Sequence, residues 1–101
     1  MIPRGRPKKH RTLKQNPKIS QFSPRGKPGR PDEVNLEADE FEAIYLSDCL
    51  NESQKQAAKS MEISQQTFSR ILKKARKLIA DAVVNGKIIR INSHPNPSKS
   101  K

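Results

Sequence analysis

A stripe of apolar residues between positions 68 and 82 constrains this chain more than any other feature of its sequence. The members recur at steps of three, one, three, three, one and three: Phe68, Ile71, Leu72, Ala75, Leu78, Ile79 and Ala82. Such spacing keeps side chains on one side of an α-helix, which makes a turn every 3.6 residues. The pattern therefore predicts a helix of about 20 residues, or about 30 Å, whose apolar side must be buried.

Signals at both ends support this helix. Ser64 is placed to act as its N-cap, with a hydroxyl that accepts a backbone N–H from the first turn. Asn85 and Gly86 are typical of a glycine C-cap. Between Arg70 and Lys77 the polar side holds five bases and no acid, which is more basic than a merely solvated helix face needs to be.

Two shorter helices are expected before the long one. Leu36, Phe41, Ile44, Tyr45 and Leu46 have helical spacing, and acids fill the first turn, so we predict a helix over about Glu37–Asp48.

Ser53, with Gln56 three residues later, has the pattern of a capping box and predicts a second helix over Gln54–Met61. Glu62 and Ile63 then form the turn. Cys49 is expected to face the core as a small apolar residue.

A short helix, a tight turn and a longer helix together predict a helix-turn-helix, with Ala58 where the two helices cross. In this motif the N-terminal half of the second helix enters the major groove of DNA. Glutamine can pair with adenine, arginine with guanine, and serine or threonine with bases or phosphates. The candidate base contacts are Gln65, Gln66, Thr67, Ser69 and Arg70. The candidate phosphate contacts are Ser53, Gln54, Lys55, Lys73, Lys74, Arg76 and Lys77.

Charge is segregated along the chain, whose net charge is +11. Residues 1–31 hold ten bases and no acid, residues 32–52 eight acids and no base, and residues 53–101 eleven bases and two acids. Such blocks indicate a polyanionic partner, whether DNA, RNA or an anionic membrane surface, since solubility alone does not require them. No apolar run approaches the ~20 residues that span a bilayer, so a cytoplasmic, nucleoid-associated protein is expected.

Residues 1–31 contain six of the eight prolines and three of the four glycines, which indicates a mobile basic arm. Within it, Arg4–Pro7 (RGRP) is similar to the core of an AT-hook. Inserted in a narrow minor groove, or simply attracted to phosphates, the arm would use Arg4, Gly5, Arg6, Lys8 and Lys9.

The expected fold class is all-α: a small helix-turn-helix bundle of three to four helices, with a basic disordered N-terminal arm and a short C-terminal strand. That strand, Lys87–Ile91, must pair with Lys18–Phe22 or with a copy of itself across a dimer. The expected domains are an arm over 1–31, a DNA-binding domain over 32–91 and a disordered tail over 92–101.

An enzyme is not expected, and no cofactor or metal is implied. The chain has one cysteine and two histidines, His10 and His94, both in the tails. These form no metal-ligand cluster, and no nucleophile–base set or phosphate-binding glycine loop appears.

Several stretches together resemble a known family: Asp39–Ile44 (DEFEAI), Gln56–Ala58 (QAA), Ser64–Leu72 (SQQTFSRIL), Ala75–Lys77 (ARK), Val84–Ile91 (VNGKIIRI) and Phe22–Gly26 (FSPRG). The resemblance covers about residues 4–92. The family is a prokaryotic one catalogued as domain of unknown function 134, and it is similar to the helix-turn-helix of sigma-factor region four. What the resemblance implies is DNA binding, with no particular regulon or ligand.

The expected function is sequence-specific binding of double-stranded DNA, as a transcriptional regulator. One alternative is an interaction module that docks its acidic first helix on a basic partner or on an RNA polymerase subunit. Another is RNA binding, although Phe41 and Phe68 fall on core positions and leave no aromatic platform for bases. The apolar stripe continues through Val83, which leaves open either a homodimer or cover by the first helix.

Overall fold

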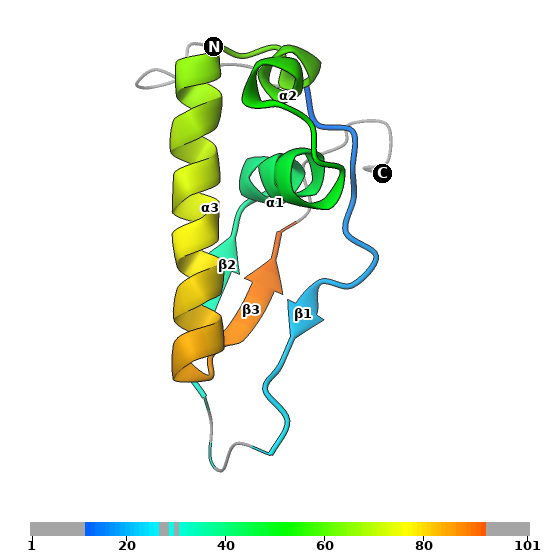
Figure 1. Ribbon diagram of the computed structural model, residues 1–101. Coiled ribbons are helices and arrows are strands. Elements are labelled where there is room, and N and C mark those ends of the chain that lie inside the picture. Colours follow the sequence, from blue (N-terminus) through cyan, green and yellow to red (C-terminus); the bar gives the residue numbers. More distant parts are fainter. Residues whose placement is uncertain (1–11, 27–28, 30, 93–101) are drawn as a thin grey trace, which may run out of the picture.

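The computed structural model describes residues 12–26, 29 and 31–92. Within them the chain forms a three-stranded sheet and three α-helices (Figure 1). In order, the elements are β1 (Gln21–Phe22), β2 (Glu33–Leu36), α1 (Ala38–Ile44), the π-helix η1 (Tyr45–Cys49), α2 (Gln54–Met61), α3 (Gln65–Asn85) and β3 (Ile88–Ile91). The predicted all-α class is therefore wrong, because the fold is mixed α/β.

The sheet has the order β1-β3-β2, with β3 in the middle. β3 runs antiparallel to β1, where Phe22 lies opposite Ile89, and this confirms, for the last two residues of Lys18–Phe22, one of the two pairings that the sequence left open. β3 also runs parallel to β2, where Leu36 lies opposite Ile91. Since parallel strands need a long crossover connection, the three helices together form that crossover between β2 and β3.

β2 is the strand that the sequence reading missed. Its side chains alternate between exposed (Glu33, Asn35) and buried (Val34, Leu36), a period of two that is typical of a half-buried strand. Four residues are a short window, and Leu36 also fits the helical spacing of the residues that follow it. These residues form a strand because they pair with β3, which lies more than fifty residues away in the sequence.

The first helix occupies most of its predicted range but changes type. After Ile44 it widens into the π-helix η1, where the amide of Leu50 donates to the carbonyl of Tyr45 at 2.9 Å. A π turn shifts the register of the residues that follow. Cys49 is consequently exposed, so the prediction that it faces the core is wrong.

The predicted bounds and caps of the other two helices are confirmed. Ser53 Oγ accepts the amide of Gln56 at 3.1 Å, and Ser64 Oγ accepts the amide of Thr67 at 3.0 Å. Gly86 ends α3 with a φ of 65°, in the left-handed region where glycine meets no steric penalty.

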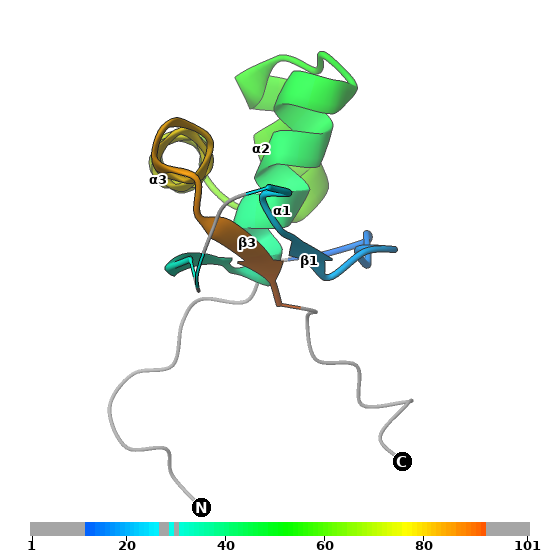
Figure 2. The same ribbon diagram turned by 90° about the horizontal axis from the view of Figure 1, so that it is seen from below.

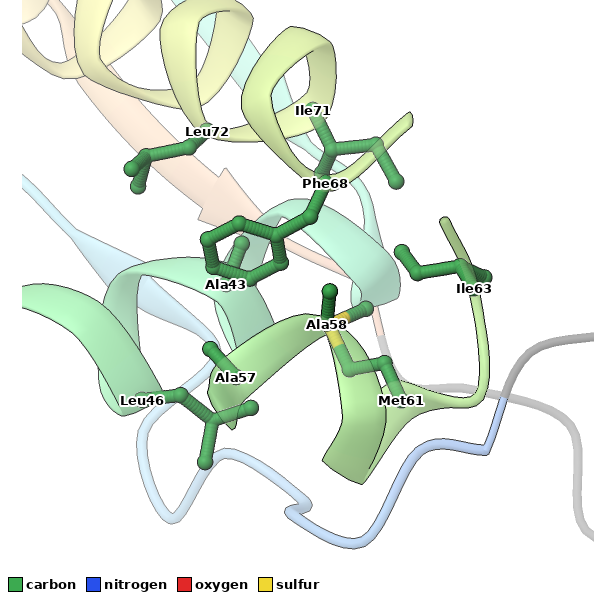
Figure 3. Close-up of a cluster of buried hydrophobic side chains, with 9 residues drawn as sticks. All are labelled: Ala43, Leu46, Ala57, Ala58, Met61, Ile63, Phe68, Ile71 and Leu72. Carbon is green, nitrogen blue, oxygen red and sulfur yellow. The ribbon is translucent and has the colours of Figure 1, made fainter. Parts of the chain in front are cut away.

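The apolar side of α3 contributes to two buried clusters. Its N-terminal half packs against α1, η1 and α2, with Phe68 in the middle of the cluster (Figure 3). Its C-terminal half packs on Leu36 and Ile91 of the sheet. Seen from below, α1 and α3 lie on the same side of the sheet (Figure 2). The first helix, through Phe41 and Ile44, and the sheet both contribute to the cluster that partly buries Leu78 and Ile79, whereas Val83 is 73% exposed. A homodimer through this part of the stripe stays a prediction.

The domain boundaries at residues 31 and 92 stay a prediction. Part of the predicted arm nevertheless lies against the rest of the protein, since β1 joins the sheet and Leu13 packs on the first cluster. In the described part of the chain, none of the helices has the length and apolar character needed to cross a membrane.

Candidate nucleic-acid interface

α2 and α3 form a helical pair joined by the turn Glu62–Ser64. The chain can reverse there because Glu62 adopts the left-handed conformation, with φ 58° and ψ 45°. The amide of Ile63 donates to the carbonyl of Ala58 at 3.1 Å and closes the turn. Ala58 is only 3% exposed and belongs to the same buried cluster as Phe68 of α3, as predicted for the crossing point.

The first turns of α3 present most of the predicted base contacts to solvent. Gln65, Gln66, Ser69 and Arg70 are all exposed. Thr67 differs: it is half-buried, and its Oγ1 accepts the Ser64 hydroxyl at 2.9 Å. Four of the five candidates are therefore accessible to a ligand, whereas the Thr67 hydroxyl takes part in the helix cap.

Four residues define what we call the outer face of α3: Gln66, Arg70, Lys73 and Lys77. At about 100° per residue, these side chains leave the helix axis within about 60° of one another, opposite the apolar stripe. Among the described residues, Arg70 and Lys73 make no ion pair or hydrogen bond. Within the described part of the chain, the outer face therefore offers two cations that take no partner, together with the exposed amide of Gln66.

The two flanks of α3 differ from the outer face because acids reach them. These acids belong to α1 and η1, which together we call the first helical segment. Asp48 accepts two hydrogen bonds from Arg76, at 2.6 and 3.0 Å. The bonds from the guanidinium lower the pKa of Asp48 and raise that of Arg76. On the other flank, Lys74 Nζ lies 3.6 Å from the buried carboxylate of Glu40. Arg76 and Lys74 thus face internal acids, and phosphate contact by either one stays a prediction.

The remaining predicted contacts lie elsewhere in the chain. At the start of α2, Ser53 and Lys55 are exposed and Gln54 is half-buried. The arm residues Arg4, Gly5, Arg6, Lys8 and Lys9 lie outside the described residues. None of the described side chains form a group of three that could hold a metal ion.

One buried acid was not singled out from the sequence. Glu42 of α1 is only 1% exposed, and its Oε1 accepts the amides of Lys14 and Gln15 at 3.1 and 2.9 Å. A signal was available, since Glu42 lies one turn before the buried Leu46 and so falls on the inward side of the predicted helix.

The described fold is a small α/β protein in which a helical pair exposes a basic outer face. The chain matches the family described as "Protein of unknown function DUF134" over residues 1–94, and it belongs to that family. This confirms the resemblance drawn from the sequence, as far as the family itself is concerned.

Three relatives show how widely the similarity extends. A UPF0251 protein of Desulfosudis oleivorans is 47% identical over 87 residues, which cover 85% of this chain and 63% of the relative. One of Vibrio vulnificus is 45% identical over 97 residues, which cover 95% and 94%. One of Methanococcus maripaludis is 44% identical over 89 residues, which cover 87% and 68%. The chain thus spans less than two thirds of the Desulfosudis relative, and no solved structure matches.

Proposed function

We propose that this protein binds double-stranded DNA through a helix-turn-helix formed by α2 and α3, and that it acts as a transcriptional regulator. The observation that carries the proposal is the outer face of α3. Its Arg70 and Lys73 are exposed and form no ion pair with the described residues. In a helix-turn-helix, the N-terminal half of the second helix is the part that enters the major groove.

The side chains along the whole outer face have the chemistry that DNA binding requires. Gln66 and Arg70, in the first two turns, have the donors and acceptors that recognise adenine and guanine edges. Lys73 and Lys77 follow one and two turns later, where a straight helix leaves the curved groove and meets phosphates. We infer that base reading and backbone contact are divided along the length of α3.

The surroundings of the acids in the first helical segment indicate that these acids have a role inside the protein and do not dock on a partner. Asp39, Glu40 and Glu42 are buried, and Asp48 is paired with Arg76. An acidic surface that docks on a basic partner would need these carboxylates free in solvent. No described feature favours the interaction module over DNA binding.

The direct test is selection of binding sites from a random duplex library with the full chain, followed by titration of a selected and a scrambled duplex. If six to ten phosphates are contacted, affinity should fall about 10³–10⁵-fold between 50 and 200 mM salt. Failure to enrich any sequence, together with binding that is insensitive to salt, would refute the proposal.

Two substitutions separate base reading from backbone contact. Arg70→Ala should reduce the preference for the selected duplex over the scrambled one by about 1–3 kcal/mol. Lys73→Ala should weaken both duplexes alike and reduce the salt slope by about one. Lys87→Ala is the charge-matched control, because Lys87 pairs with Asp81 at the opposite end of α3. Equal effects of all three changes would argue against a specific role for the outer face.

A further inference from the structure

β2 lies at an edge of the sheet, and its outer side is free within the described part of the chain. The carbonyls of Asp32 and Leu36 accept amides from β3 and the residue after it, at 2.8 and 2.9 Å. Because alternate residues of a strand face its neighbour in a parallel pair, the backbone groups of Glu33 and Asn35 point away from β3. Both residues are exposed, and the described residues supply no partner for these outward groups. Such an edge is a template for a further strand.

A second copy of β2 fits this edge in one register. Near the middle of the strand, an antiparallel pair about a two-fold axis can place Glu33 opposite Glu33, Asn35 or Glu37 of the second copy. The first register puts like charges opposite each other and leaves Asn35 opposite Pro31, which has no amide to donate. The third needs the amide of Glu37, which already donates to a side chain of α1 at 2.8 Å. Only the second register lets Glu33 and Asn35 exchange both of their backbone bonds, with Val34 opposite its own copy.

The side chains of the edge also suit this register. Glu33 and Asn35 lie on the sheet face that is turned away from the helices, because Val34 and Leu36 are the buried residues of β2. Arg90 donates to the Glu33 carboxylate at 3.0 Å and offsets its charge. In the second register each Glu33 lies beside the side-chain amide of Asn35 from the other copy, which is a donor. The pairing therefore brings a donor to each carboxylate, and no second acid directly opposite it.

The flank of α3 beside β2 adds a second surface to the edge. In Figures 1 and 2, β2 is the strand nearest α3, and Leu78 of α3 packs in the same cluster as Leu36. Leu78 also lines an open hollow of about 490 Å³ along this flank, together with Lys74 and Asp81. A two-fold axis through Val34 makes the α3 helices of the two copies antiparallel. The end of each flank that carries Lys74 then meets the end of the other that carries Asp81.

The distribution of charge favours this edge over the rest of the surface as a contact between copies. The chain has a net charge of +11, so two copies repel each other over most approaches. Residues 32–52, which include β2, hold eight acids and no base. Contact at β2 therefore brings the acidic segment of each copy next to the basic α3 of the other.

We propose that two copies of this protein associate through the free edge of β2 and the adjoining flank of α3, so that their three-stranded sheets join into one sheet of six strands. Both α3 helices then lie on the same face of this sheet, with their N-terminal turns at opposite ends. If the axis is level with Ala80, Ser69 and its copy lie roughly 33 Å apart along the helices, at about 1.5 Å per residue. That separation is close to one turn of a DNA duplex. The association itself does not depend on DNA binding.

Sedimentation equilibrium of the full chain tests the association without any duplex. The native chain should sediment as a dimer. Asn35→Pro removes an outward amide, which an edge strand tolerates, and because each copy loses one donor the dimer should weaken at least about ten-fold. Gln21→Pro is the matched control: Gln21 turns its amide to the outer side of β1, since its neighbours Ser20 and Phe22 face β3. A native monomer, or equal effects of the two prolines, would overturn the proposal.

Cysteine cross-linking tests the register. Because Cys49 is exposed, the background is Cys49→Ser, and Glu33→Cys, Val34→Cys and Asn35→Cys are compared one at a time. Position 34 lies opposite its own copy as a non-hydrogen-bonded pair, with Cα atoms about 4.5 Å apart, which a disulfide can bridge. Positions 33 and 35 meet their copies only diagonally, at about 7–8 Å. On mild oxidation Val34→Cys should therefore form a cross-linked dimer, and the other two variants should not.

Cross-linking at position 33 or 35, or at none of the three, would overturn the proposal. If circular dichroism shows that Asn35→Pro is unfolded, the cross-linking result decides by itself. Neither experiment contains DNA, so a failure of the dimer leaves the proposed function standing, and a failure to bind DNA leaves the dimer standing.

Discussion

Glu62 shows how one residue at a turn can carry strain that the rest of the fold must hold in place. Its φ of 58° lies in the left-handed region, which a side chain other than glycine enters at a cost of about 1–2 kcal/mol. Burial of Ile63 and Phe68 on either side of the α3 cap keeps the turn in this conformation. The turn of a helix-turn-helix often contains glycine, and here a glutamate occupies the position whose geometry favours it.

Glu62→Gly should accordingly stabilise the protein by about 1 kcal/mol, because glycine meets no steric penalty at positive φ. The measurement is the free energy of unfolding from urea titration. Glu62→Ala is the matched control, since it removes the carboxylate but keeps the Cβ that causes the strain. A gain of similar size in both variants would assign the effect to charge and not to the backbone.

At the scale of elements, α3 and the first helical segment divide the basic surface between them. Arg76 and Lys74, on the flanks of α3, face Asp48 and Glu40, whereas Arg70 and Lys73 face solvent. The acids therefore pair with the two bases on the flanks and leave Arg70 and Lys73 of the outer face without an ion pair among the described residues. If the protein binds DNA as proposed, a narrow basic face should fit a groove better than an evenly basic helix, because only the side facing the duplex would attract phosphates.

Asp48→Asn should release Arg76 and so raise affinity for any duplex, with a salt slope steeper by about 0.9 if the freed guanidinium reaches one more phosphate. Stability should fall only slightly, by about 0.2–1 kcal/mol, because the pair is exposed. Asp81→Asn is the control, since it frees Lys87 at the far end of α3. If Asp48→Asn and Asp81→Asn change affinity equally, only net charge matters and the flank has no special role.

At the scale of the whole molecule, the sheet and the helical pair share α3 and should unfold as one unit. The first buried cluster uses the N-terminal half of this helix and the second uses the C-terminal half. A loss of packing in the sheet therefore removes support from the helix that carries the outer face.

Ile91→Ala tests this coupling. Ile91 is 6% exposed and packs in the cluster with Leu36 and Ala75, so its truncation should cost about 2–5 kcal/mol. Circular dichroism of the helices should still show a single transition, moved to lower urea. Val84→Ala, at a site 78% exposed on α3, should change stability by less than about 0.5 kcal/mol. Helical signal that persists after the sheet has melted would contradict a shared unit.

Stability should also decline in acid. Hydrogen bonds from Arg76, from Lys87 and Asn85, and from Arg90 lower the pKa values of Asp48, Asp81 and Glu33 respectively. A carboxyl whose pKa is depressed on folding stabilises the protein above its unfolded pKa, near 4, and loses this effect as pH falls through the folded value. Urea midpoints at pH 7 and pH 3 should show the decline. Asp48→Asn should make it smaller, and a pH-independent midpoint would contradict these pairs.

Much of the local structure could be predicted from the sequence. Ser53 and Ser64 cap helices, Ala58 lies at a crossing, and most of the stripe on α3 is buried, because each depends on neighbours within about one helical turn. Along the outer face, the exposure expected of Gln66 and Arg70 follows from the same periodicity. That these groups contact DNA is a prediction that only a binding experiment can decide.

What required the tertiary structure was every feature that joins distant segments. The pairing of β2 with β3, the bond from Lys14 to Glu42 and the pairing of Asp48 with Arg76 all link residues at least 28 positions apart. Helical periodicity can be recognised in the sequence because the hydrogen bonds of a helix join residues only four or five positions apart. Strand pairing, the burial of hydrogen-bond acceptors and the ion pairs on the flanks of α3 depend instead on which surfaces meet when the chain folds. For that reason the sequence alone determined α2, α3 and the exposed face of α3, while the tertiary structure decided the sheet, the π-helix and the partners of the acids.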